Sequence, residues 1–310
     1  MKVLVTGSEG LVGSSVIRVL KNSPKVSSVV PSSRRDTNLF DKAETENLIN
    51  ETKPDILVNC AARVGGIHAN NTNRSDFILE NLKININLLE ACIPNNEIKI
   101  INLGSSCIYP LNAQNPIKES YFMTGQLEPT NSPYAVAKIT AIEIGRSITH
   151  EFGHKILNLM PTNLYGPNDY FSPIDSHVIP GLLTRMHDSK LNNQSIFEIW
   201  GTGKPLREFM FVDDLSSSIE FMLDKEWEYD LINIGTNQEI SILELGNLIK
   251  KIVKYEGDLV FDSTKPDGNP RKLLDSSLIT SLGWKPSVDL EEGLKITYDW
   301  YLENLEIKRS

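Results

Sequence analysis

Five side chains in this sequence have the types and spacing that carbonyl chemistry requires. They are Ser105, Cys107, Tyr134, Lys138 and His177. If Tyr134 and Lys138 lie in a helix, they share one face, one turn apart, and the ammonium group is expected to lower the pKa of the phenol. Ser105 and Cys107, at the end of a strand, would point to the same side of a sheet. The set predicts an enzyme that transfers protons at two points of a carbonyl substrate.

Each of these residues also has a purely structural interpretation. A thiol is most often a small buried packing residue, and a serine or a histidine can simply brace the backbone. The other histidines are expected to be structural or surface residues: His68, His150, His154 and His187. No grouping of His, Cys and Asp has metal-ligand spacing, so no catalytic metal is expected.

The start of the chain predicts a dinucleotide-binding turn. Residues 2–6 are an apolar, β-branched run typical of a buried parallel strand, and a periodic helix is expected from about Leu11 to Leu20. Gly7, Gly10 and Gly13 lie between and within them. A strand, glycine turn and helix in this order place backbone N–H groups where a pyrophosphate binds. The alternative is a glycine turn needed only for packing.

The second expected strand, Val26–Pro31, indicates which dinucleotide is bound. An NAD site would carry an acidic residue after this strand, but the chain reads Ser32-Ser33-Arg34-Arg35. Guanidinium groups suit a 2′-phosphate, which favours NADP over NAD. Glu9 is an unfavourable neighbour for that phosphate, and the alternative for the two arginines is a solvated turn.

Alternating strands and helices predict an α/β fold, a doubly wound parallel sheet of the Rossmann type. Further strands are expected at residues 55–62 and 99–105, and helices at 76–92 and 132–152. The carboxyl ends of such strands bind ligands, and Thr6-Gly7, Ala61-Ala62 and Ser105–Cys107 lie there.

The two expected domains are not separated at a single point of the sequence. A nucleotide-binding domain should span residues 1–160, with 208–236 packing back on it. A smaller C-terminal α/β substrate domain should comprise 161–207 and 237–310.

Composition narrows the class of partner. The chain has 310 residues, 40% hydrophobic and 23% charged, and a net charge of −9, which argues against nucleic acid binding. Three cysteines without a CxxC pair fit a reducing compartment. No signal-peptide pattern and no membrane-spanning apolar run is recognised, so a cytoplasmic enzyme without a membrane partner is expected.

With these residues placed, the sequence resembles the extended short-chain dehydrogenase/reductase family, from the first strand to Trp284. Within that family it resembles the bifunctional enzymes that epimerise and reduce a GDP-4-keto-6-deoxy sugar. The Tyr-x-x-x-Lys pattern alone indicates only the wider family, whereas Ser-Ser-Cys combined with Ser-His-Val-Ile-Pro is far more specific. The motifs that carry the resemblance include the glycine turn, Arg63-Val-Gly-Gly-Ile, Asn70-Asn71, Gly104-Ser-Ser-Cys-Ile-Tyr-Pro110, Leu127-Glu-Pro-Thr130, Pro133-Tyr-Ala-Val-Ala-Lys138, Pro161-Thr-Asn-Leu-Tyr-Gly-Pro167, Ser176-His-Val-Ile-Pro180, Trp200-Gly-Thr-Gly, Arg207-Glu-Phe and residues 265–272.

The resemblance implies a role for each reactive residue. Tyr134 would donate a proton to the C4 oxygen during reduction, Ser105 would polarise that oxygen, and Lys138 would bind the nicotinamide ribose. Cys107 and His177 would be the acid/base pair for epimerisation at C3 and C5. The implied reaction converts GDP-4-keto-6-deoxy-D-mannose to GDP-L-fucose with NADPH.

The resemblance also implies the binding residues. Those expected to contact NADP(H) are Gly7, Gly10, Leu11, Val12, Gly13, Arg34, Leu39, Ala61, Ala62, Leu103, Gly104, Ser105, Ser106, Tyr134, Lys138, Pro161, Asn163, Leu164 and His177. Those expected to bind the GDP-sugar are Asn163, Arg185, Trp200, Arg207, Asp267 and Lys272. The structural alternatives are a surface position for Arg185, core packing for Trp200, pairing of Arg207 with Glu208, and turn formation for Asp267 and Lys272. Phe211 replaces a histidine of some relatives without changing an assigned role.

Three other functions remain open at this stage. The first is a C4-reductase, with or without epimerase activity, on another GDP-4-keto sugar such as a GDP-heptose. The second is a sugar-nucleotide 4-epimerase with tightly bound NAD, against which Arg34, Arg35 and Cys107 argue. The third is a cofactor-sensing regulator without catalysis, which would have little reason to keep Tyr134, Lys138 and Ser105 together. The resemblance further implies a homodimer through helices near 76–92 and 133–152, and residues 168–173 are expected to cover the sugar.

Overall fold

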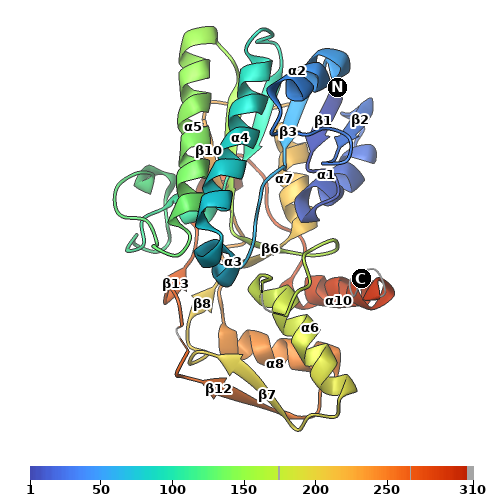
Figure 1. Cartoon of the computed structure of the whole chain (residues 1–310), viewed down its shortest axis with the longest axis vertical. Helices are drawn as coiled ribbons and strands as arrows, with labels where there is room; N and C mark the ends of the chain where they lie inside the picture. Colours follow the sequence, from blue (N-terminus) through green and yellow to red (C-terminus); the bar gives the residue numbers. More distant parts are fainter. Residues whose placement is uncertain (174, 266, 306–310) are drawn as a thin grey trace.

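The central element of the fold is a six-stranded parallel sheet in the order β10-β5-β4-β3-β1-β2 (Figure 1). Its strands are β1 (Lys2–Thr6), β2 (Ser28–Ser32), β3 (Ile56–Asn59), β4 (Lys99–Leu103), β5 (Ile156–Pro161) and β10 (Leu231–Ile234). The computed structural model describes residues 1–173, 175–265 and 267–305. Ile174, Pro266 and the last five residues of the expected substrate segment lie outside the described residues.

Helices cover both faces of this sheet, which is why all its strands except β2 are buried almost from end to end instead of alternating between buried and exposed residues. One face packs on α1 (Leu11–Lys21) and α7 (Val212–Met222), through a cluster that includes Val3 and Val5. The other face packs on α2 (Lys42–Thr52), α4 (Arg74–Cys92) and α5 (Ser132–Phe152), through a cluster that includes Leu4. Successive residues of β1 therefore serve opposite cores, as the two-residue period of a strand requires.

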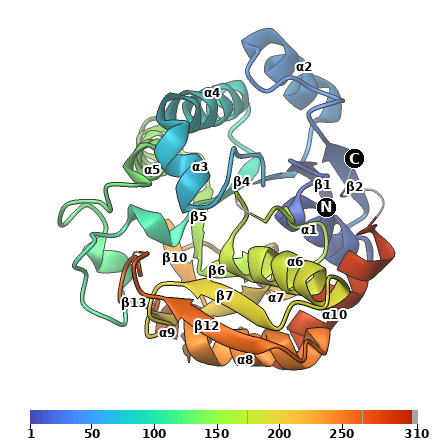
Figure 2. The same ribbon diagram turned by 60° about the horizontal axis from the view of Figure 1, so that its bottom comes forward.

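The remaining elements form a smaller layered unit below the sheet in Figure 1. The helices α6 (Val178–Leu191), α8 (Ile242–Val253) and α10 (Leu290–Glu303) enclose their own apolar cluster. Figure 2 shows the paired strands β7 (Ile196–Trp200) and β12 (Asp258–Asp262) beside α8. Two short strand groups complete the unit: β8 (Leu206–Arg207) between β11 (Ile240–Ser241) and β13 (Arg271–Lys272), and β6 (Asn163–Tyr165) paired with β9 (Phe209–Phe211).

Short elements connect these parts. A 3₁₀ turn at Ser106–Ile108 follows β4, and another at Glu119–Tyr121 lies in the loop before α5. The helices α3 (Ile67–Thr72) and α9 (Ser277–Ser281) are one to two turns long. Across the described ranges, none of the helices combines the length and the apolar character needed to cross a membrane.

The predicted parallel sheet and the predicted helix Ser132–Phe152 are confirmed, and strand ends account for most differences. The second strand runs over Ser28–Ser32 instead of Val26–Pro31, because Val26 N–H bonds Ser23 O in a turn and pairing with β1 starts only at Ser28. The strands expected at 55–62 and 99–105 end at Asn59 and Leu103.

Candidate active site

The glycine turn after β1 is shaped by close backbone packing. Gly7 has a φ of +65°, and a Cβ there would lie 2.8 Å from the backbone of Ala61. A Cβ on Gly13 would lie 2.1 Å from the Gly7 carbonyl oxygen. Only glycine fits these two positions, so the start of α1 is drawn against the ends of β1 and β3.

The same turn fits a dinucleotide pyrophosphate. Gly10 is the N-cap of α1 and supplies no side-chain cap, and the first turn of α1 contains no acidic residue. The first N–H groups of a helix lack intrahelical acceptors and carry partial positive charge, so this terminus suits a phosphate.

Two arginines follow β2, and their side chains have different neighbours. Arg35 lies 3.6 Å from the Glu9 carboxylate, so the unfavourable charge of Glu9 is balanced within the protein. The Arg34 guanidinium lies 5.2 Å from the centre of the Phe40 ring and is exposed. Arg34 is therefore the residue of this pair that is available to a 2′-phosphate.

The cofactor residues predicted from sequence gather along one edge of the sheet. Gly7–Gly13 follow β1, Arg34 and Leu39 follow β2, and Ala61-Ala62 follow β3. Leu103–Ser106 end and follow β4, and Pro161–Leu164 lie at the end of β5. The carboxyl ends of parallel strands thus bring together residues that are widely spaced in the sequence.

Ser105 and Cys107 adopt a different local structure from the one expected. Ser105 is extended, but Ser106–Ile108 form a 3₁₀ turn, and Ser105 Oγ accepts a hydrogen bond from the Cys107 N–H at 3.3 Å. The prediction that Cys107 continues the strand is therefore wrong, although the two side chains still meet, since the Cys107 thiol hydrogen-bonds Ser105. A short polar side chain that bonds its own backbone has ended the strand early.

Tyr134 and Lys138 lie on one face of α5, as predicted, yet their electrostatics differ from the prediction. Lys138 is 3% exposed, and its Nζ donates a hydrogen bond to Leu103 O at 2.7 Å. That Nζ is 5.7 Å from the centre of the Tyr134 ring. Burial lowers the pKa of Lys138 to about 8, and burial, with Cys107 as a second cause, raises the pKa of Tyr134. The expected lowering of the phenol pKa by Lys138 is wrong for this structure.

Cys107 is buried between two lysines. Its side chain is 6% exposed, and burial raises the pKa of its thiol, while Lys272, the hydrogen bond with Ser105 and Lys138 act in the opposite direction. Burial also lowers the pKa of Lys272, and Cys107 partly offsets that effect. Lys272, which the sequence placed near the GDP part, thus acts electrostatically on the Cys107 thiol.

His177 comes from another element of the fold. It is the N-cap residue of α6, and its carbonyl accepts the Gly181 N–H at 3.0 Å. The residue keeps a solvent-exposed surface, but the protein around it lowers the pKa of the imidazole by desolvation. At neutral pH the ring is therefore uncharged.

A second group of predicted residues surrounds Trp200 at the end of β7. Trp200 is 55% exposed, so core packing is the wrong interpretation for it. The Arg185 guanidinium lies 6.0 Å and the Lys265 ammonium 5.9 Å from the centre of its indole ring. An exposed indole flanked by two cations suits a flat ring that carries a negatively charged group.

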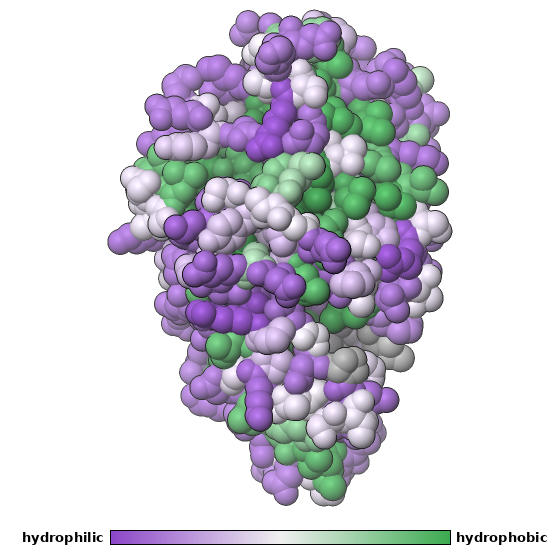
Figure 3. Space-filling model, turned by 90° about the vertical axis from the view of Figure 1, so that its left-hand side faces the viewer, coloured by the Kyte–Doolittle hydropathy of each residue, from purple (hydrophilic) through white to green (hydrophobic). Residues whose placement is uncertain are grey.

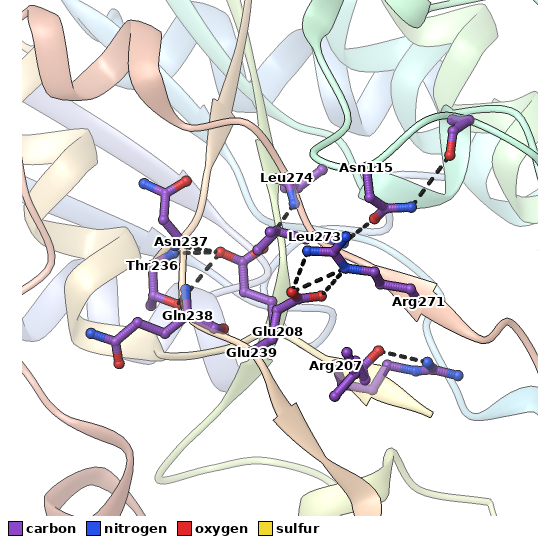
Figure 4. A network of polar contacts seen from close by, with 12 residues as sticks. Asn115, Arg207, Glu208, Thr236, Asn237, Gln238, Glu239, Arg271, Leu273 and Leu274 are labelled. Carbon is purple, nitrogen blue, oxygen red and sulfur yellow. Dashed lines mark hydrogen bonds and ion pairs between the residues drawn. The ribbon is translucent and has the colours of Figure 1, made fainter. Parts of the chain in front are cut away.

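Arg207 does not pair with Glu208, so that alternative is also wrong. Figure 4 shows the Arg207 side chain pointing away from the Glu208 carboxylate; Arg207 Nη1 donates to Leu206 O at 2.8 Å. Glu208 is fully buried and accepts backbone N–H groups instead, from Thr236 at 2.7 Å, Asn237 at 2.8 Å and Leu274 at 3.1 Å. Sequence reasoning missed this carboxylate because its donors come from two distant segments.

Asn163 and Asp267 are both engaged in holding backbone. Asn163 Nδ2 donates to Glu208 O at 2.8 Å. Asp267 accepts the Thr202 N–H at 2.6 Å and the Thr202 hydroxyl at 2.8 Å, and it attracts the Arg207 guanidinium. The structural alternative for Asp267, a role in forming a turn, is therefore correct. The turn that Asp267 stabilises is the one directly after Trp200.

Comparisons with known proteins show which family the chain belongs to. The NAD dependent epimerase/dehydratase family matches residues 3–235. The chain belongs to this family. The family match ends just after β10, so it includes Ser105, Cys107, Tyr134 and Lys138 but not Asp267 or Lys272.

Similar family members extend the comparison to the whole chain. GDP-L-fucose synthase 1 of Arabidopsis thaliana is 46% identical over 304 residues, which cover 98% of this chain and 94% of that protein. A structure of a GDP-L-fucose synthetase from Naegleria fowleri bound to NADP superposes with a TM-score of 0.92 at 28% identity, covering 100% of this chain and 95% of that one. A GDP-mannoheptose C4 reductase from Campylobacter jejuni with NADP bound gives a TM-score of 0.86 at 33% identity, with coverages of 97% and 98%.

Proposed function

We propose that this chain is a 3,5-epimerase and NADPH-dependent 4-reductase that converts GDP-4-keto-6-deoxy-D-mannose to GDP-L-fucose. The observation that carries the proposal is a thiol, Cys107, placed beside a reductase set of Ser105, Tyr134 and Lys138. A thiol at that position adds a second group that can exchange a proton, which reduction at C4 alone does not require. The similarity to GDP-L-fucose synthase 1 over nearly the whole chain supports the same reaction.

The cofactor of the proposed reaction is NADP(H). The N-terminus of α1 would hold its pyrophosphate and Arg34 its 2′-phosphate, and Ala61, Ala62, Leu103 and Asn163 lie on the same sheet edge. When bound, NADPH supplies the hydride that reduces the C4 ketone. The NADP-bound state of two similar structures supports this choice.

The hydroxyl groups of Ser105 and Tyr134 serve both half-reactions. The protons on C3 and C5 are acidic only because both carbons flank the C4 ketone. Removing either proton develops negative charge on the C4 oxygen, which two hydrogen-bond donors stabilise. The high pKa of Tyr134 keeps its proton on the phenol until the reduced C4 oxygen takes it.

Cys107 and His177 exchange the protons at C3 and C5. In the resting site the raised pKa of the thiol and the lowered pKa of the imidazole leave both groups uncharged. For Cys107 to act as base, its proton passes to the uncharged His177 imidazole, directly or through solvent, and the ammonium groups of Lys272 and Lys138 stabilise the thiolate that remains. The thiolate removes the proton from C3 or C5, and the His177 imidazolium delivers the proton that completes each inversion.

The GDP part would lie toward the smaller unit. Trp200 offers a flat apolar face, and Arg185 and Arg207 offer positive charge for the diphosphate. Burial lowers the pKa of both guanidinium groups, so an anionic ligand gains from contact with charges that water screens poorly. Asp267 acts through the turn at Gly201–Gly203, and residues 168–173 would cover the sugar.

The finer aspects of assembly are also proposals. We infer a homodimer through α4 and α5, which pack on each other and expose Leu79, Val136 and Phe152. Figure 3 shows apolar side chains gathered on the upper part of the face that includes α5. Three free cysteines support a reducing, cytoplasmic setting. The division into 1–160 with 208–236, and 161–207 with 237–310, is proposed on the same footing.

One experiment tests the reaction. The purified chain is incubated with GDP-4-keto-6-deoxy-D-mannose and NADPH in heavy water, and the product is analysed by NMR. GDP-L-fucose with deuterium at C3 and C5 is the expected product. Consumption of NADPH without deuterium at either carbon would leave a simple C4-reductase, in line with the heptose reductase relative. Unchanged substrate and cofactor would contradict the proposed substrate.

A further inference from the structure

The motif Arg63-Val-Gly-Gly-Ile plays no part in the chemistry described above. Its glycines and the histidine that follows lie against the segment that leads into α6. We propose that Gly65, Gly66 and His68 are positioning residues for His177, which they hold in place through Asp175 and Ser176. This inference rests on the proposed role of His177 in epimerisation.

Two hydrogen bonds join the segments, one from backbone and one from side chains. The Gly66 N–H donates to the Asp175 carbonyl oxygen at 2.9 Å. His68 Nδ1 lies 2.9 Å from Asp175 Oδ1, and donation to the carboxylate fixes the proton on Nδ1. One residue, Asp175, is thus held at both its backbone and its side chain, two positions before His177.

A buried asparagine side chain holds the backbone of the glycine pair in place. Asn70 is 6% exposed, and its Nδ2 donates to Gly65 O at 2.7 Å and to Gly66 O at 3.0 Å. This gives the Asn70-Asn71 motif a role as well, because Asn70 fixes the two glycine carbonyls. The Gly66 N–H that bonds Asp175 therefore belongs to a backbone segment that Asn70 holds in place.

Gly66 is needed for space and not for backbone conformation. Its φ of −66° and ψ of −178° are open to any residue. A Cβ on Gly66, however, would lie 2.5 Å from Ser176 O and 3.1 Å from Asp175 O. The absent side chain lets the backbone directly before His177 approach this closely, so a methyl group at position 66 must displace that backbone.

Contacts with Ser172 also hold the two residues before His177 in position. The Asp175 N–H donates to Ser172 Oγ at 3.3 Å, and Ser176 Oγ donates to the Ser172 carbonyl oxygen. After His177, α6 begins with the bond from Gly181 N–H to His177 O. The backbone that carries His177 is held between this helix start and the Gly66–Asp175 contact, and a shift of about 1 Å at a reacting group costs up to about 100-fold in rate.

The test compares two activities of the Gly66→Ala variant in the full chain. Deuterium exchange at C3 and C5 requires His177, whereas oxidation of GDP-L-fucose by NADP⁺ transfers hydride without epimerisation. Gly66→Ala is expected to slow exchange at least about tenfold and to leave the rate of GDP-L-fucose oxidation and its KM within about twofold. Gly125→Ala is the matched control, because a Cβ there would meet only the Pro110 side chain, at 3.1 and 3.4 Å; both activities should be unchanged.

A pair of milder variants covers the case in which Gly66→Ala does not fold. His68→Leu removes a bond between exposed groups, so exchange should fall only about threefold. His68→Asn keeps a donor at that position and should restore most of this loss. Both variants should oxidise GDP-L-fucose at the unmodified rate.

Several outcomes would overturn the inference. Equal losses of exchange and of GDP-L-fucose oxidation in Gly66→Ala would show that residues 65–68 support the fold in general. Unchanged exchange in Gly66→Ala, or equal exchange in His68→Leu and His68→Asn, would also contradict it. An unmodified chain that reduces the ketone without any exchange would overturn the proposed function together with this inference, and that result is distinct from the others.

Discussion

Tyr134 and Lys138 lie on one helix, from which Lys138 contacts the end of β4, whereas Cys107, His177 and Lys272 come from three segments far apart in the chain. Regular structure alone places the first pair: α5 packs on the sheet, and Lys138 reaches the Leu103 carbonyl. The second set depends on a 3₁₀ turn, a helix N-cap and a two-residue strand. One helix packed on the sheet therefore places the Tyr134–Lys138 pair of the reductive half, and the epimerising half is assembled from several irregular segments.

The energetic consequence is that the two halves respond to different changes. Deep burial of Lys138 in a continuous core protects the reductive pair. The epimerising residues depend on individual polar contacts such as those of Asp175 and Glu208. Each such contact contributes only about 0.5–1.5 kcal/mol net, but a buried group left without its partner costs more.

The largest expected effect isolates the reductive half. In Tyr134→Phe the proton donor to the C4 oxygen is lost, so the rate of GDP-L-fucose oxidation should fall about 10²- to 10⁴-fold. Deuterium exchange at C3 and C5 should fall much less, because Ser105 still polarises the ketone. Parallel assays of both activities test this. Equal losses of oxidation and exchange would contradict the division of the site into two halves.

The next effect concerns the buried carboxylate of Glu208. Both of its oxygens accept N–H groups, so in Glu208→Gln the new NH₂ group must face a donor, from Leu274 or from Thr236 and Asn237. The free energy of unfolding should fall by about 1–3 kcal/mol, and the KM for the GDP-sugar should rise because Arg207 and β13 lose their anchor. Denaturant unfolding and initial rates measure these quantities.

A variant at the edge of the same network provides the control for Glu208. Glu239 pairs with Arg271 at 2.6 Å, with the arginine side chain 44% exposed and the glutamate side chain 15% exposed (Figure 4). Glu239→Gln should change the free energy of unfolding by at most about 1 kcal/mol. A loss as large as that of Glu208→Gln would show that the network acts through charge and not through its buried acceptors.

A smaller effect is a change in the pH dependence of exchange. Burial raises the pKa of Cys107, so the thiolate fraction and the exchange rate should increase as pH rises toward that pKa. Lys272 lowers this pKa, so Lys272→Met should raise it further and move the rising limb by about one pH unit to higher pH. A pH profile of deuterium exchange measures the shift, and an unmoved profile would remove Lys272 from the epimerising half.

The smallest effect lies at the cofactor end of the site. Arg34→Ala should weaken NADPH binding about tenfold, through one charge-assisted contact to the 2′-phosphate, and should leave NADH binding unchanged. Arg35→Ala is the matched comparison, because Arg35 balances Glu9, and its loss should weaken NADPH binding less. Fluorescence titration with both cofactors checks the order of the two variants.

Sequence reasoning succeeded where local patterns decide the structure. The glycine spacing and the apolar run before it define β1 and α1, and the expected helix Ser132–Phe152 is α5 without change. The parallel sheet follows from the alternation of such segments. These features depend on residues that are close together in the chain, so the pattern of a single sequence is enough to predict them.

It failed where a side chain competes with the expected backbone pattern or where distant segments meet. Ser105 Oγ accepts the Cys107 N–H, and a 3₁₀ turn replaces the expected strand, so two-residue alternation gave the wrong local structure for Cys107. Burial outweighs charge at Tyr134, which spacing could not reveal. The effect of Lys272 on Cys107 requires the pairing of β13 with β8, and the donors to Glu208 come from residues 236, 237 and 274.

The measurement that tests the two-part site most directly uses Cys107→Ser. The variant is assayed for deuterium incorporation at C3 and C5 of the ketone, and for NADPH formation from GDP-L-fucose and NADP⁺. The separate construction of the two halves predicts that exchange falls at least about 100-fold while hydride transfer stays within about threefold. Equal loss of both activities would contradict it, because Cys107 would then support the whole site and not epimerisation alone.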